Sequence, residues 1–265
     1  MKLLFIGDLV GAAGRRILLD QIDRLVDHHA IDYCVVNVEN VADGFGVTPD
    51  IAEELLNAGV HCMTSGNHIW DRSDIRPYMA REPRLIRPVN YPTDLPGSGM
   101  HVGETAAGIQ VGVINVMGRV FMPATDEPFR RVSEAVAEVK KKTPVIIIDM
   151  HAEATSEKIA MGWHLDGVVS AVLGTHTHVQ TADERILPGG TAYITDVGMT
   201  GPYESVIGME RDGALARFLN RQSGRLTSAK KDPRVCAVVV DIDETTGRSR
   251  SIARLMLGPG NGRPA

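Results

Sequence analysis

The chain has 265 residues, of which 43% are apolar and 23% are charged, and this is the composition of an ordinary globular protein. Its formal net charge of −5 argues against broad binding to nucleic acids or membrane surfaces. The sequence contains neither an apolar run of the roughly eighteen residues that a membrane span requires nor a signal-peptide pattern, so we predict a cytoplasmic protein.

The first half of the chain alternates short apolar runs with helical patterns, which is typical of βαβ units and a largely parallel sheet. The expected strands are residues 3–7, 33–38 and 60–65. Between the first two, residues 14–28 carry apolar side chains at helical spacing. Thr48 and Pro49 supply a capping residue and a first-turn proline for a second helix, which Gly59 closes.

After a proline- and arginine-rich segment over residues 77–96, expected to be irregular, the alternation resumes. The expected strands are residues 111–116, 144–150, 167–173 and 191–196, and the expected helices are residues 127–142, 153–163 and, more weakly, 214–219. Residues 235–241 and 248–257 are predicted to form a closing β-hairpin. The sequence therefore predicts one α/β domain, residues 1–257, followed by a flexible tail over residues 258–265.

Polar side chains that can bind metals or transfer protons follow most of these strands. They are Asp8, Glu39, Asn40, Asn67, His68, His151, His176 and His178. Residues that follow the carboxyl ends of strands in an open α/β sheet meet at one edge of that sheet. Each has an ordinary structural explanation, such as helix capping by Asp8 or Asn67, but their joint occurrence predicts one shared site.

The chemistry of this set points to metal ions. His176 and His178 stand at i and i+2 after a buried strand, so their imidazoles project to the same side. Carboxylate, amide and imidazole ligands without a thiolate suit iron, manganese or zinc in a hydrolytic centre. The candidates are too many for one four-coordinate ion, which favours two ions that share a bridging carboxylate.

These residues also resemble a known family. The segments Gly7-Asp8, 37–44, Gly66-Asn67-His68, the lone His151 and 174–178 are similar to the motif blocks of the calcineurin-like metallophosphoesterases. Two positions depart from that pattern, because Val10 replaces a histidine and Glu39 replaces the bridging aspartate. The bacterial 2′,3′-cyclic-nucleotide 2′-phosphodiesterase branch resembles this chain in both departures.

The resemblance implies a four-layer sandwich, with mixed, mostly parallel sheets in the centre, helices outside and a C-terminal hairpin. It also implies two divalent or trivalent metal ions of iron type, with manganese or zinc as other possibilities. One ion would be held by Asp8, Glu39, Asn40 and His178, and the other by Glu39, Asn67, His151 and His176. Asn40 would take the place left by Val10.

The function implied is hydrolysis of 2′,3′-cyclic nucleotides, which opens the 2′-bond and gives 3′-nucleotides. Generic aryl phosphoesters are expected as further substrates. A hydroxide that bridges the ions would attack, and His68 would protonate the leaving oxygen as the general acid. The expected partners are a small phosphoester substrate and further copies of the chain in a homo-oligomer, without a membrane or stable nucleic-acid binding. Asp149 and Asp71 are candidates to orient ligand histidines, and Asp71 could equally well start a helix.

Other interpretations remain open at this point. The same fold could act as a phosphomonoesterase, or the metals could be structural in a nonenzymatic RNA-associated regulatory protein. A dinucleotide-binding loop after the first strand is disfavoured, because Leu9 breaks the G-x-G-x-x-G template. The loop over residues 195–202 could line a substrate pocket or merely shape its rim.

Overall fold

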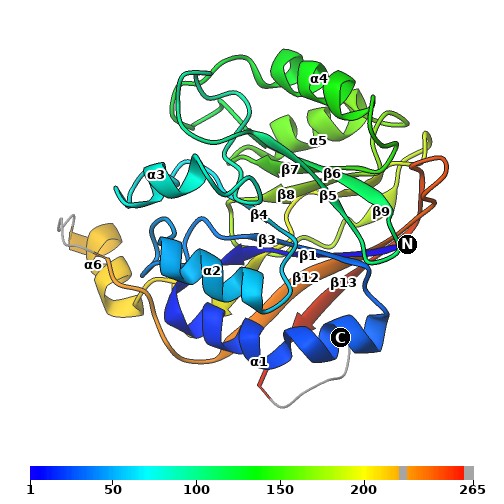
Figure 1. Cartoon of the computed structure of the whole chain (residues 1–265). Coiled ribbons are helices and arrows are strands. Elements are labelled where there is room, and N and C mark those ends of the chain that lie inside the picture. Colours follow the sequence, from blue (N-terminus) through cyan, green and yellow to red (C-terminus); the bar gives the residue numbers. More distant parts are fainter. Residues whose placement is uncertain (221–225, 260–265) are drawn as a thin grey trace.

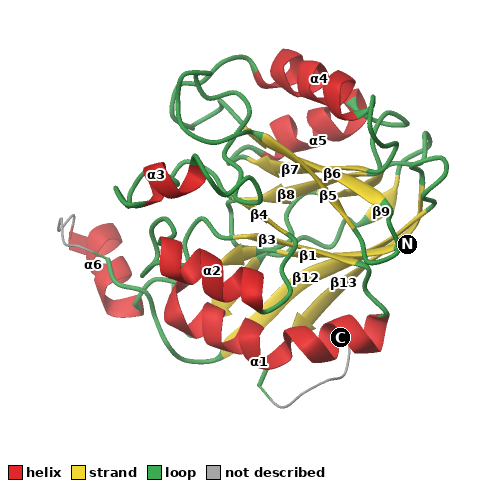
Figure 2. Ribbon diagram, in the orientation of Figure 1, coloured by secondary structure: helices red, strands yellow, loops and turns green. Residues whose placement is uncertain are grey.

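A computed structural model describes residues 1–220 and 226–259, and in it two β-sheets lie face to face with helices on their outer faces (Figure 1, Figure 2). The strands of the first sheet are β1 (Lys2–Ile6), β2 (Asp8–Leu9), β3 (Tyr33–Asn37), β4 (Cys62–Thr64), β11 (Met199–Pro202), β12 (Pro233–Ile242) and β13 (Ser249–Leu257). Those of the second are β5 (Met100–Glu104), β6 (Gln110–Met117), β7 (Ile146–His151), β8 (Ala171–Thr175), β9 (Arg185–Ile186) and β10 (Ala192–Ile194). The helices are α1 (Gly11–His29), α2 (Pro49–Asn57), α3 (Ile75–Met79), α4 (Pro128–Val139), α5 (Thr155–His164) and α6 (Arg211–Asn220).

Both sheets are mixed. The first has the order β2-β11-β12-β1-β3-β4 with β13 on β12, and the second has the order β5-β6-β7-β8-β10-β9. β1, β3 and β4 are mutually parallel, as are β6, β7, β8 and β10, while the C-terminal hairpin of β12 and β13 adds antiparallel pairs. The fold class and the closing hairpin predicted from the sequence are confirmed.

The layers follow from strands that are buried on both faces. In β1, Leu3 and Phe5 pack between the two sheets, whereas Leu4 and Ile6 pack against α1. In β7, Ile147 likewise faces the first sheet and its neighbour Ile148 faces α4 and α5. Because successive side chains of a strand point to opposite faces, such strands carry long apolar runs instead of alternating apolar and polar residues. The runs found in the sequence are therefore central strands between two apolar layers.

Several boundaries differ from those expected. The predicted strand over residues 167–173 begins only at Ala171, because a turn precedes it in which Gly167 has a φ of 75°. The expected loop over residues 195–202 contains β11, which pairs in parallel with β2. β5 and β9 have no counterpart in the prediction, and α3 begins before the segment expected to be irregular. Residues 260–265 of the expected tail lie outside the described residues.

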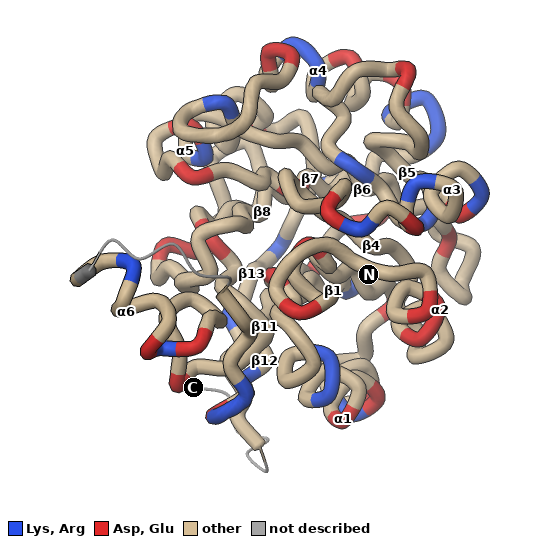
Figure 3. Tube along the Cα trace, turned by 90° about the vertical axis from the view of Figure 1, so that its left-hand side faces the viewer, with Lys and Arg blue, Asp and Glu red and all other residues tan. Residues whose placement is uncertain are grey.

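The carboxyl ends of β1, β3, β4, β7 and β8 meet at one edge of the molecule, on the left in Figure 1. That edge faces the viewer in Figure 3, where α3 and α6 lie on opposite sides of it. The two sheets are in direct contact there, since Asn37 at the end of β3 donates from Nδ2 to Asp149 Oδ2 in β7 at 2.9 Å. None of the helices in the described ranges is long and apolar enough to cross a membrane.

Candidate metal centre

The edge brings together every metal-ligand candidate of the sequence. Asp8 follows β1, Glu39 and Asn40 follow β3, Asn67 follows β4, His151 ends β7, and His176 and His178 follow β8. All but Asn67 and His176 are at most 8% exposed. The chain therefore buries carboxylates and imidazoles at one place, which is unfavourable unless they are paired or bind a cation.

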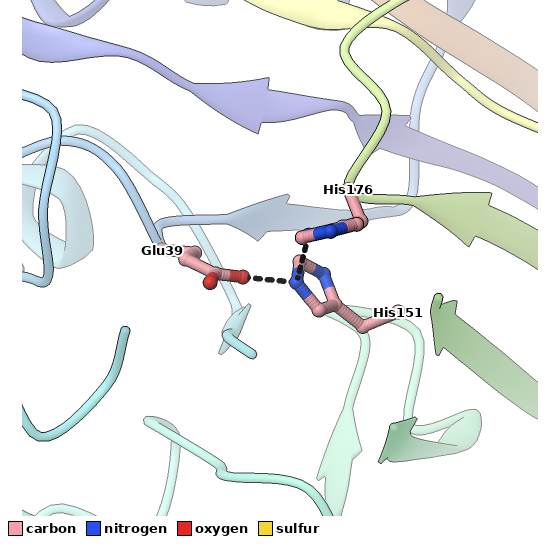
Figure 4. A group of neighbouring side chains, drawn as sticks. All are labelled: Glu39, His151 and His176. Atoms are coloured by element: carbon pink, nitrogen blue, oxygen red, sulfur yellow. Dashed lines mark hydrogen bonds and ion pairs between the residues drawn. The ribbon is translucent and has the colours of Figure 1, made fainter. Parts of the chain in front are cut away.

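Four side chains form a first cluster, the Glu39 group, which consists of Glu39, Asn67, His151 and His176. His151 Nε2 lies 2.5 Å from Glu39 Oε2 and 3.3 Å from Asn67 Oδ1. His176 Nδ1 lies 3.1 Å from the same His151 nitrogen, so ligand atoms converge from three directions (Figure 4). The carboxylate and the two imidazoles each offer an atom close enough to the others to hold one ion.

A second cluster, the Asp8 group, consists of Asp8, Asn40 and His178. His178 Nε2 lies 3.2 Å from Asn40 Oδ1 and 4.0 Å from Asp8 Oδ1. Asn40 Nδ2 donates to Gly44 O at 3.0 Å, which leaves its Oδ1 directed toward His178. The clusters adjoin, because Asp8 Oδ1 also lies 4.0 Å from His151 Nδ1.

Val10, which stands where the resembling family has a histidine, has no atom in its side chain that could bind a metal. It is fully buried and packs beside Gly208, where an added Cβ would lie 2.6 Å from Val10 Cγ1. Its backbone forms a parallel bridge with Asn40, the residue expected to supply the ligand in its stead.

The charges in the clusters are coupled. Burial alone would raise the pKa of Glu39, but its pairing with His151 lowers that pKa to about 2. Burial opposes protonation of His151, yet Glu39 and Asp8 raise the pKa of its imidazole to about 8. Burial, reinforced by the charge of His151, lowers the pKa of His176 to about 3. His176 is thus a neutral imidazole with a lone pair to offer, and a cation can replace the proton on His151 Nε2.

The donor set fits a metal ion. Glu39 Oε2 is buried and accepts no hydrogen bond from the described residues, although it lies beside His151 Nε2. Buried oxygens without a hydrogen bond are rare and call for an explanation such as an ion. Carboxylate oxygen, amide oxygen and imidazole nitrogen are ligands that iron, manganese and zinc all accept.

Thr175 fixes the orientation of His151, a role that the sequence did not reveal. Thr175 Oγ1 donates to Asp149 Oδ1 at 2.7 Å, and its single hydroxyl proton is then used. At 2.9 Å from His151 Nδ1, the same oxygen must accept the Nδ1 proton, which leaves Nε2 free to bind a metal. The expected orienting role of Asp149 is therefore exerted through Thr175, and Asn37 donates to the other oxygen of Asp149.

The side chain of His68 contacts Asp71 and Phe45. Its Nδ1 lies 2.8 Å from Asp71 Oδ2, its ring meets the edge of Phe45, and its side chain is 30% exposed. Only its backbone N–H contacts the Glu39 group, donating to Glu39 Oε1 at 2.9 Å. Asp71 therefore orients His68 and not a ligand histidine, contrary to the expectation.

Gly66→Ala is expected to eliminate metal binding by the Glu39 group. A Cβ at Gly66 would lie 2.0 Å from Glu39 Oε2 and 2.2 Å from His151 Nε2, so the methyl group would fill the space where the ligand atoms converge. Metal content after reconstitution with Mn²⁺, measured by mass spectrometry, should fall by at least one ion per chain. Gly258→Ala is the matched control, because a Cβ there meets no atom within 4 Å. Equal metal content in the two variants would contradict this account of the site.

Known proteins resemble this chain along nearly its whole length. A model of the family described as YmdB-like protein matches residues 4–255. The 2′,3′-cyclic-nucleotide 2′-phosphodiesterase of Bacillus subtilis is 46% identical over 257 residues, which cover 97% of each chain. A crystal structure of a hypothetical protein from Thermus thermophilus superposes with a TM-score of 0.91 at 39% identity, covering 97% of this chain and 99% of the other. A phosphatase from Mycoplasma pneumoniae gives a TM-score of 0.91 at 34% identity, with 97% and 93% covered.

Proposed function

This chain belongs to the YmdB-like protein family, and from that premise we propose that it is a metal-dependent phosphodiesterase that opens 2′,3′-cyclic nucleotides at the 2′-bond. The observation that carries the proposal is the convergence of Asp8, Glu39, Asn40, Asn67, His151, His176 and His178 in two adjoining ligand clusters. The name of the Bacillus subtilis relative supplies the substrate class.

The chain's own residues divide the work. One ion would be held by Asp8, Asn40 and His178. The other ion would be held by Asn67, His151 and His176, and Glu39 would bind both ions. Two ions bound there supply Lewis acidity that activates water and offsets charge on the phosphoryl oxygens. Thr175 keeps the proton of His151 on Nδ1, away from the cluster.

His68 would serve as the general acid. Asp71 accepts the Nδ1 proton of its imidazole, and Nε2 has no hydrogen-bond partner among the described residues. A protonated Nε2 can therefore donate to the leaving 2′-oxygen, which becomes the 2′-hydroxyl of a 3′-nucleotide. The exposure of the ring leaves room for a nucleotide to approach.

Several further properties belong to this proposal. The ions would be iron, with manganese or zinc as substitutes, because the ligand set accepts all three. We also propose that residues 1–257 act as one domain, that the protein works in the cytoplasm on a small phosphoester, and that it assembles as a homo-oligomer. The resemblance to the metallophosphoesterases supports the iron, the phosphoester substrate and the homo-oligomer. The same centre would hydrolyse generic aryl phosphoesters, because the ions act on the phosphoryl group.

Removal of metal is expected to abolish hydrolysis. Protein reconstituted with Mn²⁺ should cleave bis(4-nitrophenyl) phosphate and 2′,3′-cyclic AMP, whereas chelated protein should cleave neither until Mn²⁺ is restored. A panel with 3′,5′-cyclic AMP and the 2′- and 3′-monophosphates, resolved by chromatography, would identify the bond that opens. Accumulation of 3′-AMP supports the proposal. Exclusive cleavage of monoesters would make the protein a phosphomonoesterase, and turnover unaffected by the chelator would refute a metal mechanism.

A further inference from the structure

The turn that carries His176 and His178 has an unfavourable backbone conformation. Both histidines have positive φ angles, 97° for His176 and 66° for His178, in a region that L-residues other than glycine rarely adopt. Such a conformation persists only where the surrounding structure enforces it. The two side chains also reach different clusters, His176 the Glu39 group and His178 the Asp8 group.

Asp196 lies two residues after the end of β10 and accepts hydrogen bonds from the middle residue of this turn, Thr177. Its Oδ2 accepts the Thr177 N–H at 3.1 Å and the Thr177 hydroxyl at 2.7 Å. Its Oδ1 accepts the Gly198 N–H at 2.8 Å. Both carboxylate oxygens are therefore occupied by donors, and Thr177, between the two ligand histidines, is held by its backbone and its side chain.

Lys158 of α5 is the counter-ion of this carboxylate. Its Nζ donates to Asp196 Oδ2 at 2.7 Å, and both residues are 0% exposed. The aliphatic stem of Lys158 packs along β8, where a Cβ added to Gly174 would lie 3.1 Å from Lys158 Cδ. A fully buried ion pair is weak evidence for stability as such, because desolvation opposes it. Its position behind the turn instead indicates a role in orienting the ligands.

We propose that Asp196, neutralised by Lys158, is a positioning residue that holds the 176–178 turn so that its two histidines serve the two ions together. The proposal rests on the metal centre of the proposed function. It assigns the residues no contact with substrate. Because one turn supplies a histidine to each cluster, loosening the turn is expected to lower the affinity for both ions. A change confined to one cluster would mainly lower the affinity for the ion held there.

Asp196→Asn is the direct test. In the asparagine variant, an NH₂ group replaces one of the two accepting oxygens and faces a donor. The variant would therefore lose either the hydrogen bond from Gly198 or those from Thr177 and Lys158. The double variant Lys158→Met/Asp196→Asn removes both buried charges and guards against misfolding caused by an unpaired lysine. Thr177→Val keeps the ion pair and the backbone contact and removes only the hydroxyl bond. Asp166→Asn is the matched control, since Asp166 accepts the N–H groups of Gly189 and Thr191 and contacts neither the turn nor Asp196 among the described residues.

The readout is Mn²⁺ binding by calorimetry, together with the magnetic-resonance signal of a coupled manganese pair. Asp196→Asn and the double variant should bind both Mn²⁺ ions about 10–100-fold more weakly, and Thr177→Val should show a smaller loss in both. Asp166→Asn should bind both ions as the wild type does. Unchanged binding in the Asp196 variants, or loss of one ion only, would overturn the proposal. Wild-type protein that binds two ions but cleaves no phosphodiester would refute the proposed function and leave the positioning role standing, whereas wild type that binds none would refute both.

Discussion

Glu39→Gln is expected to lower kcat/KM for 2′,3′-cyclic AMP by at least about a thousandfold and to reduce the metal content of the protein. Glu39 contacts His151 through one oxygen and the backbone of His68 through the other, so it lies at the centre of the ligand set. A glutamine has nearly the same shape, but its NH₂ group presents a donor where a cation needs a lone pair. The loss therefore reports on charge and coordination and not on packing.

The measurement is steady-state kinetics over a Mn²⁺ titration, paired with metal analysis of the same samples. Glu54→Gln provides the control, because it removes a partly exposed carboxylate whose ion pair with Arg15 lies on the surface. Its kcat/KM should match the wild type. A Glu39→Gln enzyme that held two ions and turned over within tenfold of the wild type would exclude the shared-carboxylate role.

His68→Ala is expected to keep both ions and to lose roughly 10²–10⁴ in kcat with 2′,3′-cyclic AMP, the usual contribution of a general acid. The imidazole touches Asp71 and Phe45 but none of the ligand side chains, so its removal leaves the clusters intact. Asn67→Ala is the contrasting variant, because Asn67 Oδ1 points at His151 within the Glu39 group and its loss should release metal.

A change of leaving group separates acid catalysis from other roles of His68. The ribose 2′-oxygen needs a proton as it departs, whereas 4-nitrophenolate departs readily without one. The kcat deficit of His68→Ala should therefore be much smaller with bis(4-nitrophenyl) phosphate than with the cyclic nucleotide. Equal deficits on the two substrates, or metal loss like that of Asn67→Ala, would show that His68 has a different role.

The general plan of the molecule could be predicted because its central strands are buried on both faces. An apolar run such as residues 144–150 indicates a strand between two apolar layers. Because the carboxyl ends of parallel strands lie at the same edge of a sheet, the residues that follow such strands are expected to lie close together. The ligand candidates therefore emerged together although Asp8 and His178 are far apart in the sequence. Elements that depend on distant partners were missed, as β11 shows, since only its pairing with β2 and β12 makes it a strand.

The contacts that orient the ligand residues could not be predicted from the sequence. The sequence indicates that Asp149 orients a histidine, but it does not show that Thr175 lies between the two side chains. That arrangement depends on the register of β7 and β8, which places His151 opposite Thr175. For Asp71 the sequence allows two roles, the orientation of a ligand histidine or the start of a helix, because its chain neighbourhood does not reveal which ring it meets. The closeness of Gly66 to Glu39 and His151 likewise arises from packing between sheets, for which a sequence carries no local signal.

The strand order also governs when the molecule can become complete during synthesis. β1 lies between β3 and β12, and its Leu3 pairs with Val240, so one side of β1 has no partner until residues 233–242 have left the ribosome. Contacts of such large separation are slow to form and leave an open strand edge meanwhile. Asp8 is in the same position, because β2 waits for β11. The Asp8 group is therefore expected to take its final form, and to capture its ion, only after β11 has been synthesised and has paired with β2.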